Sequence, residues 1–183
     1  SKKEAPPPLP VITLSREPGS GGRLVAQGVA ERLGLDMFHQ EVLHEMASSA
    51  KVSTQVLATL DERGLNTLED LIATLVNERH LWPDEYARLL FKVIGTIGRH
   101  GKAVLVGRGA NFILPADRRF RIRVVAPLEF RVQSVAHTYD IKLEEARRRV
   151  TRTDADRKAF IRKYFNADIQ KRLIETFGAS EGD

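Results

Sequence analysis

The feature that most constrains this chain is a short apolar run followed by a cluster of glycines. Val11–Ser15 (VITLS) is rich in β-branched residues and predicts a buried strand. Residues 18–22 (PGSGG) predict a turn, and Leu24–Leu33 predicts a helix because apolar residues recur every four positions. A strand, a turn and a helix in this order are typical of a parallel α/β sheet, so we expect that fold class.

The rest of the chain continues the same pattern. Ala103–Val106 and Phe120–Val125 predict two more strands, and Asp36–Phe38 predicts a brief one. Residues 40–100 have apolar stripes at helical spacing throughout, which predicts a helical insertion. Ligands of parallel sheets bind at the carboxyl ends of the strands. Further helices are predicted over residues 128–138, 142–152, 155–165 and 169–177.

Composition excludes several classes of protein. A chain of 183 residues suits one domain, which we place over residues 11–183 after a disordered, proline-rich tail at 1–10. There is no cysteine, which excludes disulfides, zinc-thiolate sites and a thiol nucleophile. Neither a membrane span nor a signal peptide is visible, so we expect a cytoplasmic protein with no membrane partner.

The net charge of +5 is unevenly distributed. Residues 118–172 hold 12 Arg, 4 Lys and 7 acidic residues, a local net charge of +9. The planar guanidinium group suits bidentate phosphate binding, so the partner is either a phosphorylated small molecule or a nucleic acid. A solvated helix surface is the alternative explanation. The scattered aromatic residues form no evident stacking platform, which makes nucleic acid the less favoured partner.

The first glycine turn predicts a phosphate site. Gly19, Ser20, Gly21, Gly22 and Arg23 lie between a strand and a helix, where backbone N–H groups, a hydroxyl and a guanidinium can all face an anion. An ordinary glycine-rich turn is the alternative. Neither the dinucleotide fingerprint nor the strict P-loop fingerprint fits this stretch, because the expected third glycine and the Lys-Ser/Thr pair are absent.

Two further segments are candidates for anion binding. Arg108 follows the strand at Ala103–Val106 between two glycines, where it is either a phosphate ligand or a structural residue. Arg148 and Arg152, with Arg149 beside them, share a helical face that is either functional or merely solvated. The five histidines have no zinc-binding spacing, so we predict no metal ligands from the protein.

Four motifs together resemble the cytidylate kinase-like family. The resemblance covers about residues 11–168 and implies a P-loop nucleoside monophosphate kinase fold. Such a fold has three α/β/α layers, a parallel sheet, a helical acceptor-binding insertion (about 37–100) and a helical lid (about 140–165). The motifs are SREPGSGGR at 15–23, VLVGRGANFIL at 104–114, APLEFR at 126–131 and DADR at 154–157.

The resemblance also implies roles for particular residues. Gly19 to Arg23 would bind the phosphates of ATP, and Arg108 with Asn111 would bind the acceptor monophosphate. Asp36 would lie at the entrance to the insertion. Arg23, Arg108, Arg152 and Arg157 would stabilise the transferred group, with Arg131 and Asp154 also binding substrate. Mg²⁺ would be held mainly by phosphate oxygens and water.

The chain departs from true cytidylate kinases at several positions. The P-loop lysine is absent, although Arg23 could partly replace it, and Val106 and Gly109 stand where two aspartates are expected. The strand that usually follows the lid is also missing, and we expect that residues are omitted near 169–170. A core without that edge strand would expose apolar surface.

These observations lead to one main functional hypothesis and two alternatives. The main hypothesis is an ATP-dependent kinase for a nucleoside monophosphate, with CMP as one candidate acceptor. The first alternative is a protein that binds nucleotides without catalysing transfer, and the second is a nucleic-acid binder. Surplus apolar faces in residues 40–100 could be covered by a second copy of the chain in a homo-oligomer.

Overall fold

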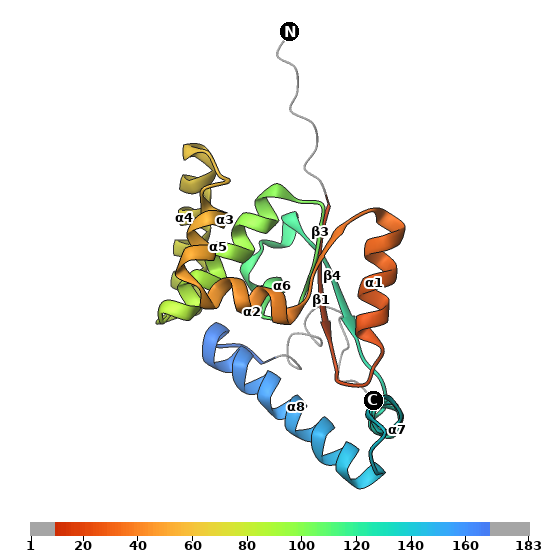
Figure 1. The fold of residues 1–183 in the computed structure, drawn as a ribbon. Helices are drawn as coiled ribbons and strands as arrows, with labels where there is room; N and C mark the ends of the chain where they lie inside the picture. The colour runs from red at the N-terminus through yellow and green to blue at the C-terminus, as the bar shows by residue number, and fades with distance from the viewer. Residues whose placement is uncertain (1–9, 169–183) are drawn as a thin grey trace, which may run out of the picture.

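A computed structural model describes residues 10–168 of the chain. Its centre is a four-stranded sheet in the order β2-β3-β1-β4, with all neighbouring strands parallel (Figure 1). The strands are β1 (Val11–Arg16), β2 (Asp36–Phe38), β3 (Ala103–Val106) and β4 (Phe120–Val124). The predicted α/β class and the parallel sheet are therefore confirmed.

The two faces of the sheet are covered by different helices. Ile12 and Leu14 of β1 pack with Ala26 and Ala30 of α1 (Gly22–Leu33) on one face. Val11 of β1 belongs instead to the larger core on the opposite face. This division follows from the strand geometry, because successive side chains point to opposite sides. Figure 1 shows α1 on one side of the sheet and α2 to α6 on the other.

The predicted insertion is helical. Side chains of Ser49, Asp61 and Asp84 cap three of its helices by accepting a backbone N–H bond in the first turn. Its longest buried face belongs to the last helix, which supplies Leu90, Phe91 and Ile94 to the main core. The helices are α2 (Gln40–Ser48), α3 (Ala50–Leu57), α4 (Glu62–Arg79) and α5 (Glu85–His100).

The C-terminal part of the described chain differs from the prediction in one respect. Residues 142–152 and 155–165 were expected to form two helices, but they form one continuous helix, α8 (Leu143–Phe165). Asp154 could have capped a second helix, but its side chain is bonded to Arg131 instead. The helix predicted at 169–177 lies outside the described residues. The remaining elements are α6 (Ala110–Ile113), a 3₁₀ turn (Ala116–Arg118) and α7 (Leu128–Tyr139).

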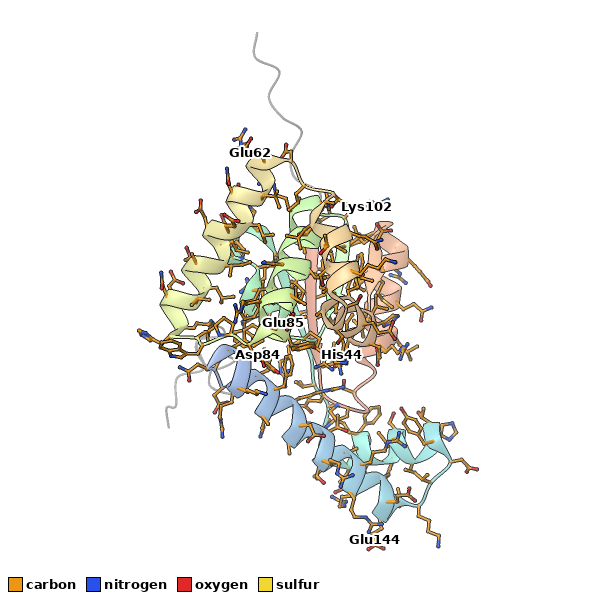
Figure 2. The ribbon with its side chains drawn as sticks, turned by 60° about the vertical axis from the view of Figure 1, so that its left-hand side comes forward. His44, Glu62, Asp84, Glu85, Lys102 and Glu144 are labelled. Carbon is orange, nitrogen blue, oxygen red and sulfur yellow. The ribbon has the colours of Figure 1, made fainter. Side chains whose placement is uncertain are left out.

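Helix α8 connects two separate cores. Its C-terminal residues Ile161 and Phe165 are buried in the main core, whereas its N-terminal half packs with α7 around a small cluster that includes Val132 and Val150. Figure 1 shows α8 passing below the carboxyl ends of the strands. The α7–α8 hairpin projects away from the sheet, with Glu144 near its tip (Figure 2). No helix in residues 10–168 is long and apolar enough to cross a membrane.

Candidate functional site

The first glycine turn leaves the start of α1 open. Gly19 and Gly21 have φ values of 76° and 83°, a conformation that side chains disfavour. Gly21 is the N-cap of α1 and makes no side-chain capping bond, so the first-turn N–H groups are available to an anion. The Ser20 hydroxyl, predicted to face a ligand, donates to the Glu17 carbonyl oxygen at 2.6 Å and so stabilises the turn itself.

The second glycine turn is conformationally strained. Gly107, Arg108 and Gly109 all have positive φ values, of 73°, 51° and 71°. For Arg108 this left-handed conformation costs on the order of 1 kcal/mol. A Cβ atom at Gly109 would overlap the ring of Phe165, which fixes the turn against α8. The Arg108 guanidinium lies over Phe160 at 4.8 Å, and its Nε is buried without a hydrogen-bond partner among the described residues.

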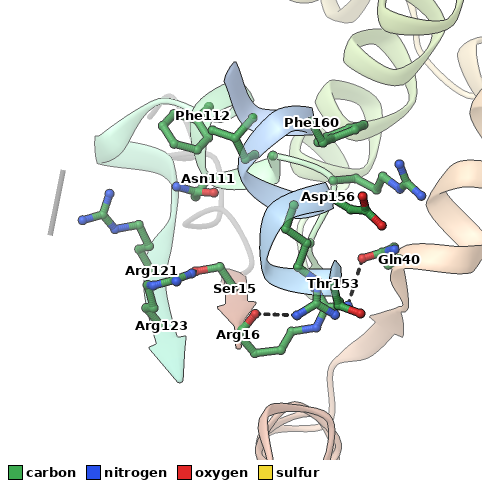
Figure 3. Close-up of a pocket in the computed structure, with 15 residues that line it drawn as sticks. Ser15, Arg16, Gln40, Asn111, Phe112, Arg121, Arg123, Thr153, Asp156 and Phe160 are labelled. Atoms are coloured by element: carbon green, nitrogen blue, oxygen red, sulfur yellow. Dashed lines mark hydrogen bonds between the residues drawn. The ribbon is translucent and has the colours of Figure 1, made fainter. Parts of the chain in front are cut away.

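A cavity of about 380 Å³ opens at the carboxyl ends of the strands, between the second glycine turn, β4 and α8 (Figure 3). Its lining is strongly basic, with a single carboxylate, that of Asp156. Two aromatic rings, Phe112 and Phe160, form apolar walls. A site of this kind suits an anionic ligand that also has a planar or apolar part. The arginines that line it are Arg16, Arg108, Arg121, Arg123 and Arg157.

The charges in this cavity repel one another. Burial, followed by the positive charge of Arg157, lowers the pKa of Arg16 to about 10. Burial also lowers the pKa of Arg123 and of Arg157, although nearby acidic groups partly oppose the effect. The Nε of Arg123 is buried without a hydrogen-bond partner in the described part of the chain. A bound phosphate would supply the missing negative charge and hydrogen-bond acceptors.

Arg131 and Asp154, predicted as substrate-binding residues, are bonded to each other. The Arg131 side chain is 9% exposed, and its Nη1 lies 3.0 Å from Asp154 Oδ2 while its Nε lies 2.8 Å from Glu17 Oε2. The Arg131 backbone also presses against Gly19. Neither Arg131 nor Asp154 lines the cavity. This network therefore holds the first glycine turn, α7 and α8 in fixed relative positions.

Of the other predicted site residues, some line the cavity and others lie outside it. Arg108, Asn111 and Arg157 all line the cavity. Arg23 is exposed in the first turn of α1, close enough to Arg16 to lower its pKa. Arg152 is exposed on α8 and does not line the cavity.

Asp36 lies at the opposite edge of the sheet from the cavity. It begins β2 and its N–H donates to the carbonyl oxygen of Lys102, just before β3. Figure 2 shows Lys102 at the end of the molecule away from α8. Asp36 was predicted to lie at the entrance to the insertion and to bind substrate; it precedes the helices of the insertion but does not line the cavity. A parallel strand has its amino end far from the carboxyl edge where ligands bind.

Several cavity residues were not singled out from the sequence. Arg16 directly precedes the first glycine turn, and Gln40 begins α2. Arg121 and Arg123 alternate with apolar residues in β4, and this period of two places them on one face of the sheet (Figure 3). The alternation of arginine with apolar residues was the sequence signal that could have identified them. In the sheet, Arg123 of β4 pairs in register with Ser15 of β1.

No protein-built metal site is present in residues 10–168, where no three His, Asp or Glu side chains gather. The one cavity carboxylate, Asp156, fits a divalent cation only if phosphate oxygens and water complete the coordination. The lining therefore fits a metal ion that arrives with a nucleotide and does not fit a resident one.

Comparison with known proteins gives consistent matches. The model of the cytidylate kinase-like family matches residues 11–174. The chain is 30% identical over 165 residues to a cytidylate kinase of Natronomonas pharaonis, a match covering 90% of this chain and 77% of that protein. It is 26% identical over 160 residues to a cytidylate kinase of Halorubrum lacusprofundi, covering 87% of this chain and 74% of that protein.

A solved structure has a similar fold. The crystal structure of an uncharacterized protein from Eubacterium ventriosum matches with a TM-score of 0.64 and 23% sequence identity. The match covers 87% of this chain and 81% of that one. At this identity the likeness concerns the fold alone.

Proposed function

The chain belongs to the cytidylate kinase-like family, and from that premise we propose that it transfers the γ-phosphoryl group of ATP to a nucleoside monophosphate. CMP is the first acceptor to test, because the relatives carry the name cytidylate kinase. The observation that carries the proposal is the arginine-lined cavity at the carboxyl edge of the sheet, with its buried, unpartnered guanidinium nitrogens.

The first glycine turn is the proposed donor site. The N–H groups of Gly21, Gly22 and Arg23 at the open start of α1 would hold the phosphates of ATP. Because Gly19 has no side chain, the turn packs closely against the backbone of Arg131, and this contact supports the turn. Arg23 adds a positive charge at the start of α1 and would partly replace the absent P-loop lysine.

The cavity is the proposed acceptor site. Arg108 and Arg157 would bind the acceptor phosphate, with Asn111 beside them. Both side chains are partly buried, so a dianion would form charge-assisted hydrogen bonds there with less competition from water. Arg131 and Asp154 are positioning residues in this scheme, since they reach the substrate only through the turn and the helix that they hold.

Transfer requires an oxygen of the acceptor phosphate to attack the γ-phosphorus while the bond to the β–γ bridging oxygen breaks. The protein supplies position and positive charge. Bound with ATP, Mg²⁺ would neutralise charge between the β- and γ-phosphates, with Asp156 available to its water shell. Arg152 lies on the projecting α7–α8 hairpin and would reach the phosphates only if that hairpin closed, which would also exclude water.

A coupled assay that detects ADP, with ATP, Mg²⁺ and each of CMP, UMP, AMP and GMP, tests the proposal. We expect turnover with at least one acceptor, and a loss of about 100-fold or more in Arg108→Ala. Protein that melts cooperatively and gives no turnover with any acceptor would contradict it.

The second candidate is nucleotide binding without transfer. It is favoured by one specific feature: the P-loop lysine is absent, and Val106 and Gly109 stand where the resemblance to true cytidylate kinases implies two carboxylates. Calorimetry decides between the two candidates. Heat of binding with ATP or CMP, together with no phosphoryl transfer, would support this second function.

A further inference from the structure

We propose that Arg16 is a further catalytic residue, which contacts the transferred phosphoryl group midway between the donor turn and the acceptor arginines. The inference rests on the proposed phosphoryl transfer and names a residue to which no role has been assigned. The supporting observation is that the Arg16 side chain extends across the carboxyl edge of the sheet.

The Arg16 side chain spans the space between the two glycine turns. Its Cβ and Cγ pack against Gly22, where an added Cβ would overlap them. Its Nη1 lies beside Gly107, where an added Cβ would be 2.7 Å away. Two glycines, one in each turn, therefore leave room for this one side chain. Figure 3 shows Arg16 extending from the end of β1 toward Gln40 at the cavity.

The Arg16 guanidinium hydrogen-bonds to a neutral side chain, and the carboxylate that influences its charge is the exposed one of Glu41. Its Nη2 donates to Gln40 Oε1 at 2.9 Å, and it forms no ion pair with a carboxylate among residues 10–168. A second guanidinium is held next to it, because Arg157 Nη1 donates to the Arg16 carbonyl oxygen at 2.7 Å. Positive charge is concentrated at this point, because Arg157, Arg108 and Arg23 lower the pKa of Arg16 after burial itself, although the carboxylate of Glu41 partly opposes them.

This position matches what phosphoryl transfer needs. A γ-phosphoryl group leaving the first glycine turn for an acceptor at Arg108 and Arg157 must cross the space that Arg16 lines. Its N–H groups would donate to the equatorial oxygens as the acceptor oxygen bonds to the γ-phosphorus. The bridging oxygen leaves with the electron pair on ADP, and Arg16 keeps all its protons. Arg23 is exposed on α1, so Arg16 is the more firmly held cation.

A structural role for Arg16 makes the opposite prediction about stability. Keeping this buried group charged at neutral pH costs folding free energy, because burial depresses its pKa. If Arg16 is retained for a ligand, Arg16→Met should raise the melting temperature while weakening anion binding. If Arg16 serves only to tie β1 to Gln40, the same substitution should lower the melting temperature and leave anion binding unchanged.

The experiment compares Arg16→Met and Arg16→Lys with wild type and with the control Arg147→Met, which breaks an exposed ion pair to Glu129. We expect Arg16→Met to lose at least about 100-fold in kcat with a smaller change in KM, and Arg16→Lys to recover part of it. We also expect the affinity for pyrophosphate, measured by thermal shift and calorimetry, to fall at least tenfold in Arg16→Met only.

The two readouts separate the inference from the proposed function. Wild-type protein without turnover on any acceptor would overturn the proposed function, and the inference that depends on it, whatever Arg16 binds. Wild-type turnover with an unchanged kcat in Arg16→Met would overturn the inference alone. A pyrophosphate affinity that is equal in Arg16→Met and Arg147→Met would also overturn it, independently of any turnover.

Discussion

The buried Arg131 and the partly buried arginines of the cavity differ in how their positive charge is balanced. Arg131 is 8% exposed and forms ion pairs with both Glu17 and Asp154. Arg16, Arg108 and Arg157 are partly buried at the cavity without an ion pair in the described part of the chain. Arg131 therefore has two carboxylate partners within the chain, whereas the guanidinium charges of Arg16, Arg108 and Arg157 are available to a bound anion.

The presence or absence of a carboxylate partner indicates which arginines stabilise the fold and which bind a ligand. A buried cation without a counter-ion costs free energy and persists when something outside the chain supplies the anion. Arg16, Arg108 and Arg157 have no ion pair within residues 10–168 and fit that description, whereas Arg131 holds two elements together through its ion pairs. Substitutions that exchange the properties of the two groups therefore test the assignment.

The largest effect on stability is expected from Arg131→Met. It leaves the carboxylates of Glu17 and Asp154 unpaired below the first glycine turn, at a cost of about 3 kcal/mol in the free energy of unfolding. Urea denaturation measures the loss. The matched control is Arg147→Met, whose ion pair to Glu129 is exposed and should contribute less than about 0.5 kcal/mol. Equal losses in the two variants would remove the distinction between paired and exposed arginines.

The next effect should appear in function and not in stability. Arg108→Gly removes a cavity cation and relieves a left-handed backbone, while losing the contact with the Phe160 ring. These contributions nearly cancel, so the free energy of unfolding should change by less than about 1 kcal/mol. Phosphoryl transfer should fall at least about 100-fold. A variant that unfolds easily but retains its turnover would reverse the assignment of Arg108.

The smallest effect is expected from Glu41→Gln, which removes an exposed carboxylate near Arg23 and Arg16. A backbone hydrogen bond at the start of α2, followed by Arg23 and Arg16, lowers its pKa below 4.5. A depressed carboxyl pKa contributes stability above the unfolded value, and that contribution is lost as the pH falls through the folded value. Glu41→Gln should therefore lower the melting temperature by about 1 °C at pH 7. The difference from wild type should shrink as the pH falls below the usual range of a glutamate pKa, and a difference independent of pH would contradict this origin.

The sequence predicted those parts of the site that depend on local order along the chain. The strand, glycine turn and helix at residues 11–33, and Arg108 between two glycines, are local patterns that survive without tertiary information. The sequence predicted no separate role for Arg16, because its neighbours Gly22, Gly107 and Gln40 come together only in the folded protein.

Long-range pairing explains why some charged residues lie in surroundings that the sequence did not predict. Nothing in the sequence distinguishes Arg131 from Arg157, yet Arg131 meets Asp154, 23 residues away, and Arg157 meets the backbone of Arg16, 141 residues away. The family resemblance implied that Asp36 lies at the entrance to the insertion and binds substrate. The strand direction, which fixes it at the amino edge, becomes evident only from its pairing with Ala103.

The central claim is that the unpaired arginines at the carboxyl edge form a binding site for phosphate. The most direct measurement is the anomalous difference map of a crystal soaked in tungstate, a tetrahedral anion that resembles phosphate. We expect a peak within hydrogen-bond distance of the guanidinium groups of Arg16, Arg108 and Arg157. Peaks found only along the exposed arginines of α8, such as Arg148 and Arg152, with none in the cavity, would contradict it.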